Sequence, residues 1–124
     1  MSAASLEMSL DAGALAALDD AVGADNVVMI MDTILGSVPT MRGQLRAAAV
    51  SGNLRGLVHV AHQLKSECAY MGATGLCARL QQIESRAEEG RLTRPVAEVD
   101  VVWTLLEQFL SALRSVRNAR ALVA

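Results

Sequence analysis

Aromatic residues are nearly absent from this chain of 124 residues. It holds one Trp, one Tyr and one Phe, although 52% of its residues are hydrophobic. Sheet cores draw heavily on aromatic and β-branched side chains, whereas Leu, Ala and Met are strong helix formers. The composition therefore favours a core built where helices pack together, and the chain is long enough for one such domain.

Cysteine is scarce as well, with two residues in the whole chain. Cys68 and Cys77 are well separated, and no further ligands stand at the close spacing that zinc sites show. We therefore expect two free thiols that pack as small hydrophobic residues. The sequence predicts neither a metal site nor a resident cofactor.

Neither sign of charge dominates the chain, whose net charge is −2 and whose pI is near 5.6. Nucleic-acid binding requires a basic face, so this class of function is not expected. The N-terminus lacks the basic and apolar segments of a secretory signal. No apolar stretch approaches the roughly 18 residues that span a bilayer. We expect a cytoplasmic, monomeric protein that binds neither membrane nor nucleic acid.

Hydrophobic residues recur at helical spacing, and no strand pattern interrupts them. Residues 1–10 are expected to form a flexible tail, and residues 11–124 a single domain. Capping and stop residues predict five helices: one from Asp11 to Gly23, one of roughly 26–50 capped by Asp25, one of about 54–70 capped by Asn53, one from Thr74 to Gly90, and one opened by Pro95 that reaches Val116.

The second predicted helix contains a proline, Pro39, which predicts a bend or a break near Val38. The other long helices carry no such interruption. Four long helices with short links indicate an all-α, antiparallel up-down four-helix bundle, with a short extra helix at its N-terminal end.

His62 lies on the third predicted helix, beside the core rather than in it. If Ala61 and Leu64 face inward, His62 is turned about 100° away from Ala61. Lys65 and Ser66 follow three and four residues later and share its face. A phosphoryl acceptor requires a neutral imidazole that solvent reaches, and histidine is neutral close to physiological pH. Lys65 would offset the charge of an incoming phosphoryl group.

Glu84, on the next predicted helix, is a candidate to orient this imidazole. If its carboxylate accepts a hydrogen bond from Nδ1, the lone pair of Nε2 stays available for attack. Gln81 could also point towards the His62 side. A zinc site on His59 and His62 is not expected, since this pair has no third ligand at a fitting position.

This stretch resembles the histidine-containing phosphotransfer (HPt) domain of bacterial multistep signalling relays. Members of that family carry a pattern similar to A-H-x-L-K-G-S, followed by Gly-Ala, spaced apolar residues and a Glu or Gln. The chain matches this pattern at Ala61, His62, Leu64, Lys65, Gly72, Ala73, Leu76 and Glu84, and Leu80 and Ile83 fill apolar positions. The resemblance extends over roughly residues 14–116.

The resemblance implies a role for each matched polar residue. His62 would carry the phosphoryl group, Lys65 would assist, and Glu84 would contact the imidazole. The chain departs from the family pattern after the lysine, where Ser66-Glu67 stands in place of Gly-Ser. Glu67 adds negative charge beside a site that would meet the acidic pocket of a receiver domain, so it would tune partner choice or slow the transfer.

The resemblance also implies docking of receiver domains from response regulators or hybrid histidine kinases near the histidine. We assign Ser66, Glu67 and His59 to this contact. Met29 joins them, because the apolar run 27–38 is wider than one buried stripe requires. A thicker core is the alternative explanation of that run. Any Mg²⁺ would belong to the receiver.

The function implied is that of a phosphorelay intermediate. His62 would accept a phosphoryl group from the aspartyl phosphate of one receiver and pass it to the aspartate of another. No glycine-rich phosphate loop or other ATP-binding motif is present, so kinase activity of its own is not expected. Two alternatives stay open: the phosphoacceptor module of a chemotaxis-type kinase, and a helical adaptor that binds receivers without accepting phosphate.

Overall fold

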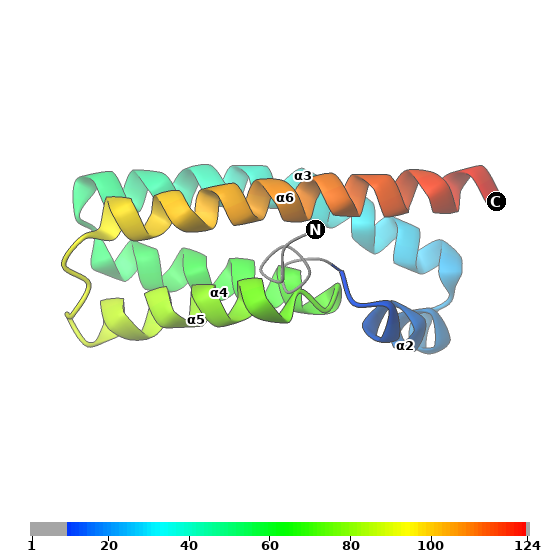
Figure 1. Cartoon of the computed structure of the whole chain (residues 1–124), viewed down its shortest axis with the longest axis horizontal. Coiled ribbons are helices and arrows are strands. Elements are labelled where there is room, and N and C mark those ends of the chain that lie inside the picture. The colour runs from blue at the N-terminus through cyan, green and yellow to red at the C-terminus, as the bar shows by residue number, and fades with distance from the viewer. Residues whose placement is uncertain (1–9, 124) are drawn as a thin grey trace.

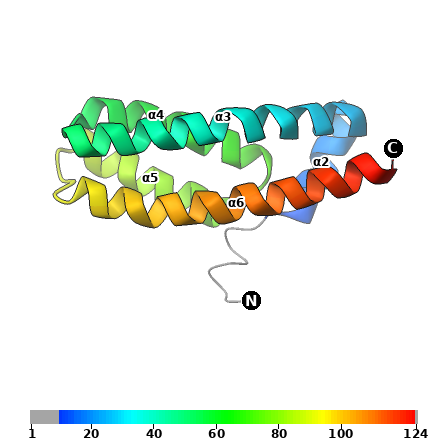
Figure 2. The same cartoon turned by 90° about the horizontal axis from the view of Figure 1, so that it is seen from above.

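The computed structural model describes residues 10–123, and this part of the chain is helical throughout apart from short links. Its helices are α2 (Ala12–Val22), α3 (Ala24–Ser51), α4 (Leu54–Tyr70), α5 (Thr74–Glu88) and α6 (Pro95–Val123). Helices α3 to α6 alternate in direction and each packs against two of the others, while α2 lies at one end (Figures 1 and 2). The predicted four-helix bundle with a short extra N-terminal helix is confirmed.

The predicted flexible tail lies outside the described residues, with one exception. Leu10, which we assigned to the tail, packs against the hydrophobic core. Within residues 10–123 no single helix is long and apolar enough to cross a membrane, although α2 and α3, which meet at 119°, pass that test as a bent pair.

Two of the predicted helix caps are confirmed. The Asp11 carboxylate accepts hydrogen bonds from the backbone N–H groups of Gly13 and Ala14 at the start of α2. The Asn53 side chain accepts one from the N–H of Gly56 at the start of α4. Each cap satisfies donors that the first turn of a helix leaves without a partner.

Two other predicted caps, Asp25 and Thr74, are wrong. Gly23 has a positive φ of 89°, so the chain turns within one residue and α3 begins at Ala24, with Asp25 inside its first turn. The N–H of Thr74 is taken by the carbonyl of Gly72 in the preceding turn. Thr74 is therefore already the first helical residue, and no side chain caps α5.

Of the bend or break predicted near Val38, the break is wrong, because α3 is one helix of 28 residues with Pro39 inside it, while the bend stays a prediction. The proline is exposed, while Ile34 and Val38 before it and Leu45 after it are buried. Packing on both sides of the proline stabilises the helix, which offsets the hydrogen bond that a proline cannot donate.

The core consists of the apolar stripes of all five helices, and it explains most of the run 27–38. Val27, Met31 and Val38 are buried, whereas Met29 is 65% exposed. The apolar residues at helical spacing on α5 and α6 are buried, except that Val116 is only partly so: Leu76, Leu80, Ile83, Ala87, Val99, Val102, Leu106, Phe109 and Leu113. Helix α4, which carries His62, also buries one face, and this burial fixes its rotation in the bundle.

Candidate functional site

The rotation of α4 places His62 on an exposed flank of the bundle. Ala61 and Leu64 are fully buried, while the His62 side chain is 61% exposed. The helix is amphipathic, with apolar residues at three-and-four spacing, so burial of that stripe turns the histidine outward. A large part of the ring is therefore accessible to a partner.

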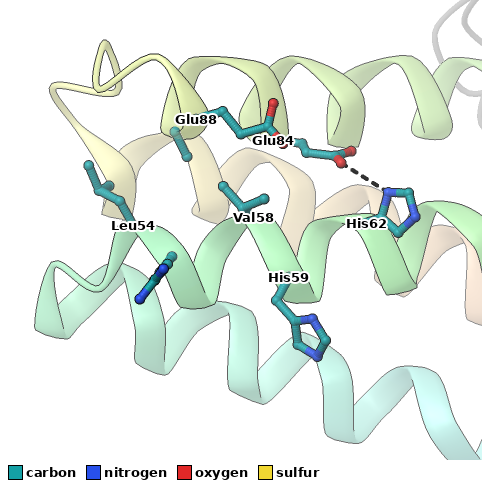
Figure 3. A pocket seen from close by; sticks show the side chains of 8 residues that line it. Leu54, Val58, His59, His62, Glu84 and Glu88 are labelled. Atoms are coloured by element: carbon teal, nitrogen blue, oxygen red, sulfur yellow. Dashed lines mark hydrogen bonds and ion pairs between the residues drawn. The ribbon is translucent and has the colours of Figure 1, made fainter.

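Glu84 on α5 holds one nitrogen of this ring. Its Oε1 lies 2.9 Å from His62 Nδ1, across the α4–α5 contact, and Figure 3 shows the two side chains facing each other. A carboxylate only accepts hydrogen bonds, so Nδ1 carries the proton and Nε2 keeps its lone pair in the neutral ring. The predicted contact between Glu84 and His62 is present.

Among the described residues, Glu84 is a charged residue that is buried, and its side chain is 10% exposed. Burial raises the pKa of its carboxyl group, but hydrogen bonds from Lys65 and His62 outweigh burial and bring the pKa below the ordinary value of 4.5. The group is therefore a carboxylate at neutral pH.

A lowered pKa makes Glu84 a source of stability that depends on pH. Its contribution is present above pH 4.5 and is lost as the pH falls through the lower pKa of the folded state. We expect Glu84→Gln to reduce the free energy of unfolding by about 1–3 kcal/mol at neutral pH and by less at about pH 3. Urea unfolding at the two pH values measures the difference.

Glu88→Gln is the matched control, since Glu88 lies one turn further along α5 and is exposed. It should change stability little at either pH. An effect of Glu84→Gln that is the same at both pH values would contradict the assigned charge.

Lys65 completes the pairing of the Glu84 carboxylate. Its Nζ donates to Glu84 Oε2 at 2.8 Å, so the two oxygens of Glu84 serve two different partners on α4. Lys65 Nζ also donates to Gln81 Oε1, and Gln81 Nε2 donates to Ser85 Oγ at 2.9 Å. The sequence indicated Gln81 only as a side chain that could point this way, and it missed Ser85, although the spacing of four residues on one helix was available as a signal.

The remaining predicted site residues line hollows on the two sides of His62. One hollow of about 500 Å³ lies over α4 and α5 and includes His59 and Glu88; in Figure 3 the His59 ring points away from Glu84. The other, of about 560 Å³, lies between α3 and α4 and includes Ser66 and Glu67. Ser66 Oγ donates to the carbonyl of His62, so its hydroxyl is turned to the helix backbone.

Met29 is further from the histidine than predicted. It lines a third hollow, together with Glu67 and Tyr70, that does not include His62. Glu67 is shared between this hollow and the one beside His62, so it links the two. Met29 therefore lies on the same α3–α4 surface as Glu67, but it does not line a hollow next to His62.

No group of three metal-ligating side chains comes together within the described part of the chain. Cys68 and Cys77 are both free thiols, the first buried and the second partly so. Burial raises the pKa of both thiols, and they stay protonated at neutral pH. Their predicted role as packed hydrophobic residues fits Cys68 fully and Cys77 in part.

Fold and site together define a helical bundle with an oriented histidine whose ring is open to solvent. A family model described as the Hpt domain matches residues 29–116, a range that contains the whole site. Because the match covers more than half of the chain, the protein belongs to the Hpt domain family.

Similar proteins agree with this assignment. The phosphorelay protein LuxU of Vibrio cholerae serotype O1 is 32% identical over 87 residues, which cover 70% of this chain and 77% of that protein. LuxU of Vibrio harveyi is 33% identical over 97 residues, or 78% and 85% of the two chains. The crystal structure of histidine-containing phosphotransfer protein B from Pseudomonas aeruginosa PAO1 has a TM-score of 0.81 and 25% identity, and the match covers 89% of this chain and 95% of that one.

Proposed function

We propose that this Hpt protein is a phosphorelay intermediate of two-component signalling, with Nε2 of His62 as the atom that carries the phosphoryl group. The observation that supports this most is the 2.9 Å hydrogen bond between His62 Nδ1 and Glu84 on a ring that is 61% exposed. A fixed tautomer and open access are the two properties that a histidine nucleophile needs.

The reaction transfers one phosphoryl group, and no atom changes its oxidation state. The Nε2 lone pair attacks the phosphorus of a receiver aspartyl phosphate, and the bond from phosphorus to the aspartate oxygen breaks, which returns the aspartate as a carboxylate. The proton on Nδ1 stays in place, so the phosphorylated ring carries a positive charge that the Glu84 carboxylate stabilises. Attack by a second receiver aspartate on the same phosphorus reverses these changes.

Lys65 would stabilise the negative oxygens of the phosphoryl group. An ammonium group has three donors, and Glu84 and Gln81 use two of them. The side chain is 24% exposed, one turn along α4 from His62. Its charge therefore lies close to the transferred group on the side that faces solvent.

The partners we propose are receiver domains of response regulators or hybrid histidine kinases. Ser66, Glu67 and His59 line the hollows next to His62, and Met29 extends the α3–α4 side of this surface. Mg²⁺ would be supplied by the receiver, and the protein would have no resident cofactor and no kinase activity of its own. Its cytoplasmic location and monomeric state stay predictions from the sequence.

A two-step transfer assay tests this proposal. A receiver labelled on its aspartate is mixed with the protein in the presence of Mg²⁺, and an unlabelled second receiver is added later. We expect label to move to the protein and then onward, and no label to be taken directly from ATP.

The alternatives predict other results in the same assay. A chemotaxis-type module would take label only from a kinase domain with ATP. An adaptor would bind the receiver and stay unlabelled, and that outcome would overturn the proposal.

A further inference from the structure

The amide of Gln81 is held at both of its ends. Its Oε1 accepts a hydrogen bond from Lys65, and its Nε2 donates to Ser85 Oγ at 2.9 Å. An ammonium group has only donors, so it faces the oxygen of an amide and never the nitrogen. The amide nitrogen then needs an acceptor of its own, which Ser85 supplies. Lys65, Gln81 and Ser85 therefore fix one another's geometry.

In this position the positive charge of Lys65 lies on the Glu84 carboxylate, which contacts the His62 ring. Lys65 Nζ lies 2.8 Å from Glu84 Oε2, and His62 Nδ1 lies 2.9 Å from Glu84 Oε1. A carboxylate without a cation would favour the doubly protonated, positive form of the imidazole beside it. That form has no lone pair on Nε2 and cannot attack phosphorus. An ammonium group on the same carboxylate weakens this effect.

Gln81 gives the Lys65 ammonium a second acceptor in this position. A lysine side chain loses much rotational freedom when its end is fixed, and Glu84 alone must offset that loss. The second acceptor on Gln81 stabilises the same position and leaves the ammonium bridging two residues of α5. Loss of this acceptor would let Lys65 spend more time in solvent, away from Glu84.

The other charged groups near the site are placed around its edge. Within the described residues, the hydrogen bonds and ion pairs of the Glu84 side chain are those with His62 and Lys65. The α3 side of the neighbouring groove consists of uncharged side chains. The ionisable groups that surround the network are, on α4, Arg55, His59 and Glu67 and, on α5, Cys77 and Glu88. Lys65 is thus the cation that decides the balance at Glu84.

We propose that Gln81 is a positioning residue which, together with Ser85, holds the Lys65 ammonium on Glu84 and thereby offsets the negative charge behind the His62 ring. The consequence for transfer rests on the proposed function of His62. The effect on the ring itself does not, and it is present in the protein without a partner.

The test compares Gln81→Met with Gln82→Met. Methionine keeps the length of glutamine and removes the acceptor, and Gln82 is a matched control because it lines a hollow towards α6. Nitrogen-15 NMR of the His62 ring is recorded from about pH 5 to 8.5. We expect the titration midpoint of the ring to move up by about 0.5 pH unit in Gln81→Met and to stay unchanged in Gln82→Met.

The phosphorylation rate provides a second readout. In Gln81→Met the rate should be lower at every pH, because a displaced Lys65 stabilises the phosphoryl group less, and the loss should be about two- to threefold larger near pH 6.5 than at about pH 8.5. Ser85→Ala should shift both readouts in the same direction by a smaller amount. A midpoint equal to that of the wild type, or a loss of rate that is the same at every pH, would overturn the proposal.

The two proposals fail in different ways. If the wild type takes no label, the proposed function is wrong, and the NMR midpoint still decides the role of Gln81. If the wild type takes label and the two methionine variants have the same midpoint, only the role of Gln81 is wrong.

Discussion

Replacement of His62 by Gln is expected to abolish phosphorylation of the protein by a labelled receiver. Glutamine has no nitrogen lone pair that attacks phosphorus, since its amide nitrogen only donates hydrogen bonds. Its side chain is of similar length, and position 62 is exposed, so the bundle should fold as before. The measurement is the label bound to protein after reaction with the phosphorylated receiver and Mg²⁺.

His59→Gln is the matched control for this prediction. His59 is also exposed, lies one turn before His62 on α4, and has a ring that points away from Glu84 (Figure 3). It should keep most of the label, and the label on the wild type should be labile in acid and stable in base. Label that persists in His62→Gln and disappears in His59→Gln would contradict the assignment of the site.

Among Gly→Ala substitutions in the links between helices, Gly72→Ala is expected to cause the largest loss of stability. Gly72 has a φ of +71°, and a Cβ atom there would lie 2.6 Å from Asp11 Cβ and 2.7 Å from Ala14 Cβ. The N–H of Asp11 also donates to the carbonyl of Met71, so α2 is tied to this turn. Strained backbone and overpacking together should cost about 2–5 kcal/mol, measured by urea unfolding.

Gly90→Ala separates the two causes of this loss. Gly90 has a φ of +67°, but a Cβ atom there would meet no atom within 4 Å. It should therefore cost only the backbone strain, about 1–2 kcal/mol. Equal losses in the two variants would show that the packing of α2 against Gly72 contributes nothing.

Much of the fold followed from the sequence because apolar spacing and stop residues are local signals. Pro95 opens α6, and Asn53 caps α4, as the sequence predicts. A break at Pro39 was one of the two outcomes expected, and it is absent because residues packed on both sides of the proline stabilise the helix. Asp25 and Thr74 were misjudged because the one-residue turn at Gly23 and the three-residue link 71–73 set the helix starts, and both depend on how neighbouring helices meet.

The parts of the site that could be predicted are those whose residue types indicate a chemical role directly, such as a histidine and a carboxylate. A histidine on one helix and a carboxylate at position 84 on the next were sufficient to predict the contact of His62 with Glu84. The ion pair of Lys65 with Glu84 was not predicted, since the sequence assigned Lys65 to the phosphoryl group. The contact of Gln81 with Lys65 was not predictable, because an exposed glutamine has no preferred partner until two helices are placed side by side. The same holds for the close approach of α2 to Gly72.

We propose that Glu84 orients His62 so that Nε2 accepts the phosphoryl group. The most direct measurement is a phosphorus–nitrogen correlation NMR spectrum of the phosphorylated protein labelled with nitrogen-15 in histidine. We expect one phosphorus nucleus coupled to Nε2 of His62, with Nδ1 still protonated. Coupling to Nδ1 of His62, or to a nitrogen of His59, would contradict it.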